Sequence, residues 1–168
     1  EAIRDCHRII RVNQLIEKKG YYEMDFENLK KLAKEERTRL IILCSPHNPV
    51  GRVWREAELL RLGKICCENN VLIFSDEIHA DFIMKGNKFI SAGTISTDIT
   101  DNLILSFAPS KTFNIAGLGA SVIVVANEKI RERMKNRIKM NRYPGSNVFG
   151  PIAGEAAYLY GDDYIKEL

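Results

Sequence analysis

An α/β fold with a mixed, mostly parallel sheet and helices on both faces is predicted by three features of the 168-residue sequence. Short apolar runs rich in β-branched residues alternate with amphipathic, helix-like segments, which is typical of parallel α/β sheets. The runs are continuously apolar, as in strands that are covered on both faces. No repeat or linker rich in Pro, Gly or Ser divides the chain, so one domain is expected at this length.

The first helix-to-strand unit is expected between residues 25 and 44. Asp25 can cap a helix whose apolar positions lie on one side. These positions are Phe26, Leu29, Leu32 and Ala33. "RLIILC" (residues 39–44) then has the composition of a buried strand.

The same pattern follows in the next segment, where residues 55–69 predict a helix with Leu59, Leu60 and Ile65 facing inward. Three more strands are expected in "VLIFS" (71–75), "NLILSF" (102–107) and "ASVIVVA" (120–126). The short connection between the last two contains no obvious crossover helix. That pair is therefore expected to be antiparallel or separated.

Composition excludes several classes of protein. The sequence is 45% apolar, 28% charged and carries a formal charge of +3, and no apolar run approaches the ~18 residues of a membrane span. "NEKIRERMKNRIKMNR" (127–142) is strongly basic, yet Ile130, Met134 and Ile138 recur at helical spacing. We expect this apolar stripe to pack and the cations to be solvated, with a phosphate-binding surface as the alternative. Neither a membrane nor a nucleic acid is expected as a partner.

The cysteines indicate a reducing compartment, because they show neither CxxC pairs nor the density of a disulfide scaffold. They are Cys6, Cys44, Cys66 and Cys67. We expect small buried hydrophobic residues, no metal site and a cytoplasmic location, since no leader is evident. The chain starts without methionine and stops inside the helix-like "DDYIKEL", so a fragment of a longer protein is expected.

Polar loops follow three of the predicted strands: "SPHNPVG" (45–51), "DEIHADF" (76–82) and "APSKTFN" (108–114). In open α/β sheets the ligand crevice lies beyond the carboxyl ends of the strands. Asn48, Asp76 and Lys111 are therefore expected to meet in one crevice.

These residue types suit pyridoxal 5'-phosphate. A lysine amine such as that of Lys111 can condense with its aldehyde to form a Schiff base. A carboxylate such as Asp76 keeps the pyridine nitrogen protonated, and the Asn48 amide can donate to the ring oxygen. The hydroxyl of Ser110 is a candidate phosphate ligand. Taken singly, each residue also has an ordinary explanation as a solvated loop lysine, a turn or cap aspartate, or a turn asparagine before Pro49.

Together these motifs resemble the fold-type-I pyridoxal-phosphate enzymes, the aspartate-aminotransferase superfamily. "NPVG" (48–51) resembles its N-P-x-G turn, Asp76 its pyridinium carboxylate, and Ser110 with Lys111 its Schiff-base lysine motif. The resemblance extends from about Tyr22 to the last residue. It implies that residues 1–168 form part of the large pyridoxal-phosphate-binding domain, without the amino-terminal segment and the carboxyl-terminal small domain, and that the full-length protein is a homodimer.

Within the superfamily the sequence motifs are most similar to those of the MalY/PatB-type cystathionine β-lyase group. "CSPHNPVGRVW", "SDEIHADF", "SKTFNIAGL" and "EAAYLYG" carry this similarity. His79 stands where aminotransferases usually have a tyrosine that donates to the ring hydroxyl, so a cofactor contact is expected, with an ordinary interior histidine as the alternative. The similarity implies a carbon–sulfur β-lyase that eliminates a thiol from a sulfur amino acid, giving pyruvate and ammonia.

The resemblance implies that Lys111 first holds the cofactor and then removes the Cα proton of the substrate. If that proton returns to the cofactor, the same residues support transamination, so a class I/II aminotransferase is the first alternative. A catalytically silent truncated domain is the second.

Other residues near the motifs are expected to have structural rather than catalytic roles. Glu77 and Asp81 are expected to form structural pairs or caps, Trp54 to anchor the following helix, and Arg52 only to be solvated. His47 is left unassigned. "GLGAS" (117–121) precedes a strand, whereas a dinucleotide-binding loop follows one and opens a helix. That reading is therefore excluded.

Overall fold

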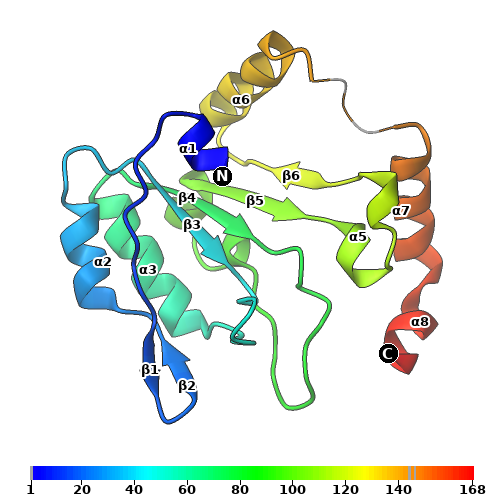
Figure 1. Cartoon of the computed structure of the whole chain (residues 1–168), viewed down its shortest axis with the longest axis horizontal. Coiled ribbons are helices and arrows are strands. Elements are labelled where there is room, and N and C mark those ends of the chain that lie inside the picture. The colour runs from blue at the N-terminus through cyan, green and yellow to red at the C-terminus, as the bar shows by residue number, and fades with distance from the viewer. Residues whose placement is uncertain (1, 144, 146) are drawn as a thin grey trace.

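The computed structural model describes residues 2–143, 145 and 147–168. Its main sheet contains β3 (Leu40–Cys44), β4 (Leu72–Asp76), β5 (Leu103–Phe107) and β6 (Val122–Val124), in that order. β3, β4 and β5 are parallel, and β6 is antiparallel to β5 (Figure 1). The mixed, mostly parallel sheet is confirmed, and the last pair is antiparallel.

Before residue 128, the described part of the chain contains nine further helices and strands. They are α1 (Ala2–Asp5), β1 (Ile16–Lys18), β2 (Tyr21–Glu23), α2 (Phe26–Ala33), α3 (Glu56–Glu68), η1 (Ala92–Thr94), α4 (Thr97–Asp101), α5 (Pro109–Thr112) and η2 (Ala116–Leu118). β1 and β2 form a separate antiparallel hairpin. Three helices follow the sheet: α6 (Glu128–Met140), α7 (Phe149–Tyr160) and α8 (Asp162–Glu167).

The start of α2 agrees with the sequence. The Asp25 side chain accepts a hydrogen bond from the backbone N–H of Asn28 at 2.9 Å, which satisfies one of the unpaired donors of the first turn. Leu29 and Ala33 are buried on the inner side of the helix. The capped, amphipathic helix is confirmed.

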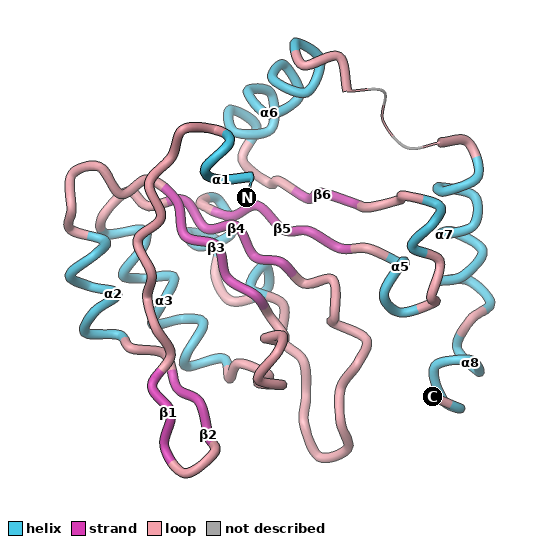
Figure 2. The backbone as a smooth tube through the Cα atoms, in the orientation of Figure 1, coloured by secondary structure: helices cyan, strands magenta, loops and turns pink. Residues whose placement is uncertain are grey.

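The hydrophobic core lies between one face of the sheet and helices α2, α3 and α4. Its members from the helices are Leu29, Ala33, Leu59, Leu62, Ile65, Cys66 and Ile99, and from the strands Leu43, Ile73, Leu103 and Leu105. Figure 2 shows α2 and α3 side by side at this face. On the other face of β3, Leu40 and Ile42 are 47% and 52% exposed. The expectation of helices on both faces is thus confirmed for one face of the described chain.

Some expectations about burial were wrong. β6 is shorter than the apolar run 120–126 that predicted it, and its three residues are exposed. No residue of α6 is buried and Ile138 is exposed, so its apolar stripe does not pack as expected. Local apolar spacing defines a helix face, but a second surface is needed to cover it.

The cysteines also differ in their surroundings. All four are free thiols, but Cys6 is exposed and only Cys66 is fully buried. Burial raises the pKa of the Cys66 thiol to about 12, because the charged thiolate is poorly solvated there. Among the described residues, no helix combines the length and the apolar character that a membrane crossing requires.

Candidate active site

The site is organised by the register of three neighbouring strands. Cys44, the last residue of β3, pairs with Asp76, the last residue of β4, and Asp76 pairs with Ser106 near the end of β5. The loops after these strands therefore leave the sheet at one edge, as Figure 1 shows. The segments that follow these strands carry Asn48, His79 and Lys111.

Asp76 is held in a fixed orientation. Its Oδ1 accepts a hydrogen bond from the Ser106 hydroxyl at 2.9 Å and a longer one, 3.4 Å, from the backbone N–H of Ile78. Successive side chains of a strand alternate between faces, and Ile73 and Ser75 are buried, with Ile73 part of the core against α3. Asp76 and Ser106 thus lie on the opposite face, and Asp76 is half-buried.

Asn48 lies in a tight turn after β3. The backbone N–H of His47 donates to Arg52 at 2.7 Å, and that of Gly51 donates to His47 at 2.8 Å. Gly51 has a φ of +70°, a conformation that side chains disfavour. The turn thus has a defined backbone, while Asn48 itself is exposed at the sheet edge.

Lys111 and Ser110 lie on α5, and not in a loop as the sequence suggested. Pro109 occupies the first turn of this helix, where a missing N–H costs nothing. The backbone N–H of Phe113 closes the turn on the carbonyl of Pro109 at 2.9 Å. Lys111 is exposed and Ser110 is half-buried.

His79 is half-buried in the segment after β4. Its carbonyl accepts from the backbone N–H of Phe82 at 3.0 Å, and the two rings are 6.5 Å apart and tilted. Its contact with a cofactor stays a prediction.

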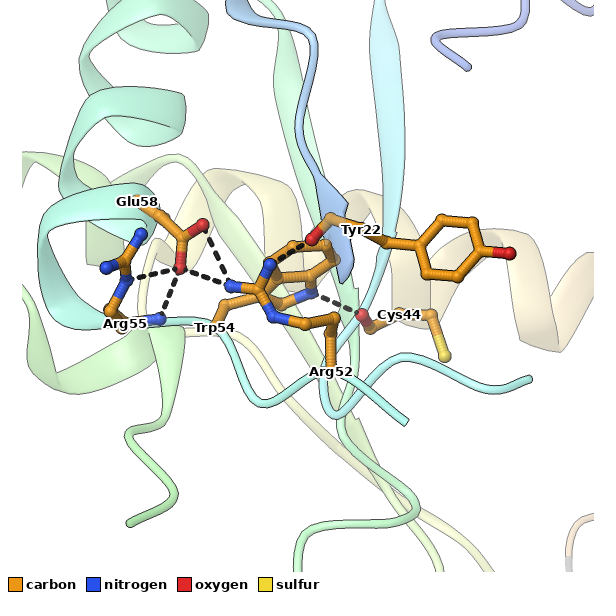
Figure 3. A network of polar contacts seen from close by, with 6 residues as sticks. All are labelled: Tyr22, Cys44, Arg52, Trp54, Arg55 and Glu58. Carbon is orange, nitrogen blue, oxygen red and sulfur yellow. Dashed lines mark hydrogen bonds and ion pairs between the residues drawn. The ribbon is translucent and has the colours of Figure 1, made fainter. Parts of the chain in front are cut away.

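Arg52 is not solvated, contrary to the expectation from sequence. It is 7% exposed, and its guanidinium donates to both carboxylate oxygens of Glu58 at 2.8 and 2.9 Å. It also donates to the carbonyl of Tyr22 and lies over the Trp54 ring at 4.6 Å (Figure 3). A buried cation requires such partners because desolvation is costly. Arg52 therefore links the turn that carries Asn48 to the β1–β2 hairpin.

Trp54 anchors the same turn to the sheet. Its side chain is 1% exposed, and its Nε1 donates to the carbonyl of Cys44 at 2.8 Å, as Figure 3 shows. Trp54 belongs to the core, and its hydrogen bond holds the turn to β3; that it anchors the following helix stays a prediction. Trp54 and Arg52 together fix the backbone on one side of Asn48.

Glu58 stays ionised within this network. Burial raises its pKa, but hydrogen bonds from the Arg55 backbone, from Arg52 and from the Arg55 side chain outweigh burial and hold the pKa below its ordinary value. An ionised Glu58 is what the buried Arg52 requires as its counter-ion.

Glu77 forms the structural contacts expected of it. It is 1% exposed, and its Oε1 accepts from the Ser75 hydroxyl at 3.0 Å and from the Ala92 backbone at 2.9 Å. Burial raises the pKa of Glu77 despite these bonds. A hydrogen bond with the Ser91 side chain also lowers the pKa of Glu77, but burial outweighs all three bonds.

The ring of His47 is held against Trp54. Its ring packs edge-on against Trp54 at 5.9 Å, and its Nδ1 is buried without a partner among the described residues. Burial lowers the pKa of His47, so the ring is neutral near pH 7.

A hollow of about 400 Å³ lies beside these loops. It is lined by Glu77, Ile78, Ala80, Asp81, Phe89, Phe107, Ala108, Val122 and Tyr158. None of the expected site residues is among them, although six are close in sequence to Asp76, His79 or Ser110: Glu77, Ile78, Ala80, Asp81, Phe107 and Ala108. The position of the strand ends and their polar groups therefore locates the site better than the shape of the hollow does.

Two residues that hold the site in place, Ser106 and Thr112, were not expected from the sequence. Ser106 was read only as part of an apolar run, although a serine inside "LILSF" is itself a signal that a polar neighbour needs a donor. Thr112 is 1% exposed and donates to Asp81 at 2.6 Å, so the structural pairing expected for Asp81 is confirmed. Thr112 is 31 residues away from Asp81 in sequence, so no local sequence pattern indicates that the two residues pair.

The polar groups at this edge fit pyridoxal phosphate chemically. A carboxylate offers only acceptors, as a protonated ring nitrogen requires, whereas an amide and a hydroxyl offer donors to ring and phosphate oxygens. Asp76, oriented by Ser106, and the exposed Asn48 and Lys111 supply these groups. No group of three or more His, Cys, Asp or Glu side chains able to hold a metal occurs in the described ranges.

Comparison with known proteins agrees with this reading. PatB of Bacillus subtilis (strain 168), a cystathionine beta-lyase, is 42% identical over 161 residues, which are 96% of this chain and 42% of PatB. Cystalysin from Treponema denticola, whose crystal structure contains a pyridoxal 5'-phosphate cofactor, matches with a TM-score of 0.93 and 40% identity over 99% of this chain and 42% of that chain.

A further solved structure also contains pyridoxal phosphate. The pyridoxal-phosphate-bound C-S lyase from Staphylococcus hominis matches with a TM-score of 0.90 and 36% identity, covering 99% of this chain and 41% of that chain. The chain thus spans about two fifths of the length of these relatives. The family model for aminotransferase class I and II matches residues 3–158. The chain belongs to the aminotransferase class I and II family.

Proposed function

We propose that the protein containing this chain is a pyridoxal-phosphate-dependent carbon–sulfur β-lyase of the cystathionine β-lyase type. One observation carries the proposal: the carboxylate of Asp76, fixed by Ser106, lies in register with β3 and β5, and the segments that follow these two strands bear Asn48 and Lys111. The likeness to the cystathionine beta-lyase PatB and to the C-S lyase from Staphylococcus hominis supports the reaction class. Residues 1–168 would then supply part of the large cofactor-binding domain.

Each polar residue has a distinct role in this proposal. When bound, pyridoxal phosphate supplies an aldehyde for covalent attachment and a protonated ring that withdraws electrons from the substrate Cα. Asp76 holds the proton on the ring nitrogen, because its charge favours the cationic form. Asn48 donates to the ring oxygen and Ser110 to the phosphate. His79 contacts the cofactor with its ring in this proposal.

Lys111 accepts and moves the proton of the reaction. Its amine would hold the cofactor through the aldehyde, and it would be free once the substrate is bound. As a free amine it then takes the Cα proton. The Cβ–S bond breaks, sulfur leaves as a thiolate that is reprotonated, and hydrolysis of the remaining three-carbon unit by water gives pyruvate and ammonia.

An aminotransferase is the competing function, because the matching family model is that of aminotransferase class I and II, but the relatives of highest identity reported above support it less than the lyase. The two reactions use the same residues and separate after the Cα proton has been removed. Elimination requires a leaving group on Cβ and no second substrate. Transamination requires an amino-group acceptor.

The full-length protein should therefore be incubated with pyridoxal phosphate and L-cystathionine, with and without a 2-oxo acid. We expect pyruvate, ammonia and a thiol in equal amounts in both reactions, and none from Lys111→Ala. Formation of a keto acid only when the 2-oxo acid is present would identify an aminotransferase. No turnover of either kind, or full turnover by Lys111→Ala, would overturn the proposal.

The family resemblance also supports a homodimer in the cytoplasm. Size-exclusion chromatography with light scattering on the full-length protein measures the assembly directly. We expect the mass of two chains, and the mass of one chain would contradict the dimer.

A further inference from the structure

The helix that carries Lys111 is too short to hold itself in place. α5 consists of four residues, Pro109–Thr112, and one backbone hydrogen bond from Phe113 to Pro109 closes it. Nucleating a helix costs more than a single turn returns, so isolated helices of this length are not stable. Contacts with the rest of the fold must therefore set the position of Lys111.

The strongest polar contact of α5 goes to the segment that follows Asp76. Thr112 is 1% exposed, and its hydroxyl donates to Oδ2 of Asp81 at 2.6 Å. A carboxylate acceptor makes such a bond short and strong. Because the hydroxyl of Thr112 is buried, water cannot replace this acceptor without a rearrangement.

Helix α7 contacts the opposite side of the same turn. The rings of Phe113 and Tyr158 pack edge to face with centroids 5.2 Å apart. Burial raises the pKa of Tyr158, the charge of Asp81 raises it further, and a hydrogen bond with Thr112 lowers it. Tyr158, Thr112 and Asp81 therefore form one connected cluster, in which only Asp81 belongs to the Asp76 segment.

Two further links stiffen the Asp76 segment itself. Ser106 donates to Asp76 at 2.9 Å, and the backbone N–H of Glu77 donates to the carbonyl of Ser106 at 2.9 Å. The exits of β4 and β5 are thus joined at the sheet edge and again at Asp81 and Thr112. Between these two ties lies the stretch of β5 and α5 that ends in Lys111.

We propose that Asp81 is a positioning residue that, by accepting the hydroxyl of Thr112, fixes Lys111 relative to Asp76. The inference rests on the proposed function, in which these two groups are the amine and the acid of one site. Asp81 itself has no contact with the reacting atoms in this scheme. Loss of the tie should loosen α5 while the core stays intact.

The test uses Thr112→Val in the full-length protein, because valine keeps the shape of the side chain and removes the donor. We expect pyridoxal phosphate to be released about tenfold faster and kcat to fall about tenfold. Each tenfold change corresponds to ~1.4 kcal/mol. KM should change less than about twofold. Thr112→Ser retains the hydroxyl and should restore both values. The Asp81→Ala/Thr112→Val double variant should be no worse than Thr112→Val, because both changes remove one bond.

Thr100→Val is the matched control. Thr100 donates to the carbonyls of Gly93 and Ser96 at 3.0 and 2.8 Å, so this variant loses hydrogen bonds in α4, away from α5. Its cofactor release rate and kcat should equal those of the wild type even if its melting temperature falls. Hydrogen exchange in the cofactor-free protein adds a second readout: the amide of Phe113 should exchange faster in Thr112→Val and unchanged in Thr100→Val.

The outcomes separate the two claims. If the wild type holds the cofactor on Lys111 but Thr112→Val matches it in release, kcat and Phe113 exchange, the positioning role is overturned and the proposed function stands. If the wild type holds no lysine-bound cofactor, the proposed function fails and this inference fails with it.

Discussion

The hydroxyl of Ser106 on β5 donates to Oδ1 of Asp76 on β4 across 2.9 Å. This bond crosses two adjacent parallel strands at paired positions, so the backbone register itself brings the donor to the carboxylate. Hydrogen bonds to charged groups contribute about 1.5–3 kcal/mol, enough to define one orientation of the side chain.

Ser106→Ala should therefore weaken cofactor binding without unfolding the protein. We expect the Kd for pyridoxal phosphate to rise about tenfold, equivalent to ~1.4 kcal/mol, because Asp76 loses the donor that aims it. Spectrophotometric titration of the full-length protein measures this. Ser121→Ala, at an exposed position, is the control and should bind as the wild type does. An unchanged Kd for Ser106→Ala would contradict the role of this bond.

Arg52 and Glu58 should be far more important for stability than surface ion pairs. Arg52→Met leaves the Glu58 carboxylate buried without its main counter-ion, and breaking a buried pair costs about 3 kcal/mol. Urea unfolding should show this loss, whereas Glu35→Gln, which removes the exposed partner of Arg11, should change stability much less. Replacing both partners, in Arg52→Met/Glu58→Leu, should recover part of the loss. A double variant as unstable as the sum of the single variants would argue against a coupled pair.

Glu77 should make stability depend on pH with an unusual sign. Its folded pKa is raised, chiefly by burial, above the ordinary value of about 4.3. Between these two values the unfolded chain releases the proton while the folded chain keeps it, so stability falls as pH rises through this window. Glu77→Gln cannot ionise, and its amide oxygen can still accept from Ser75 and Ala92.

The stability of Glu77→Gln relative to the wild type should therefore increase as pH rises from about 4 toward 7. Urea unfolding at a series of pH values measures the difference. Glu155→Gln, on the exposed surface of α7, is the control, and its difference from the wild type should stay nearly constant. A Glu77→Gln difference that is independent of pH would show that Glu77 titrates alike in both states.

Gly63 on α3 should not tolerate alanine. A Cβ there would clash with Cδ1 of Ile99 and lie 2.6 Å from its Cγ1, so the close approach of α3 and α4 depends on the missing side chain. The helix-propensity gain of about 1 kcal/mol is outweighed by an overpacking cost of ~1–3 kcal/mol. Thermal unfolding should show a lower Tm for Gly63→Ala.

The same contact allows an internal check. Ile99→Ala alone leaves a cavity and should cost about 2–5 kcal/mol. In Gly63→Ala/Ile99→Ala the added methyl group enters that space, so the double variant should be more stable than the sum of the single effects implies. Strict additivity would mean that the two positions do not touch.

Much of the fold followed from local pattern. Asp25 and the apolar positions after it defined α2, and four apolar runs located the four strands of the main sheet. The antiparallel pairing of β6 was left open, because the connection from residue 107 to 120 has no periodicity that separates the two arrangements. The burial of α6 was predicted wrongly, since its spacing cannot say what covers it.

In the candidate site, too, some residues could be predicted from the sequence and others could not. Asn48, Asp76 and Lys111 could be singled out because each lies in the polar segment that begins where an apolar run ends, and the observed register brings those strand ends to one edge. The residues that hold them could not be found in this way. Arg52 finds its partner through the fold of the next helix, and Thr112 through a loop on another strand. Such pairings depend on tertiary geometry, which periodicity does not record.

The central claim is that Lys111 is the residue that bonds covalently to pyridoxal phosphate. Borohydride reduction of the cofactor-loaded, full-length protein makes that linkage permanent, and peptide mass spectrometry then locates the added mass. We expect the pyridoxyl group on the peptide that contains Lys111, in close to one copy per chain, and no modification in Lys111→Ala. A label on a different lysine, or no label at all, would contradict the account.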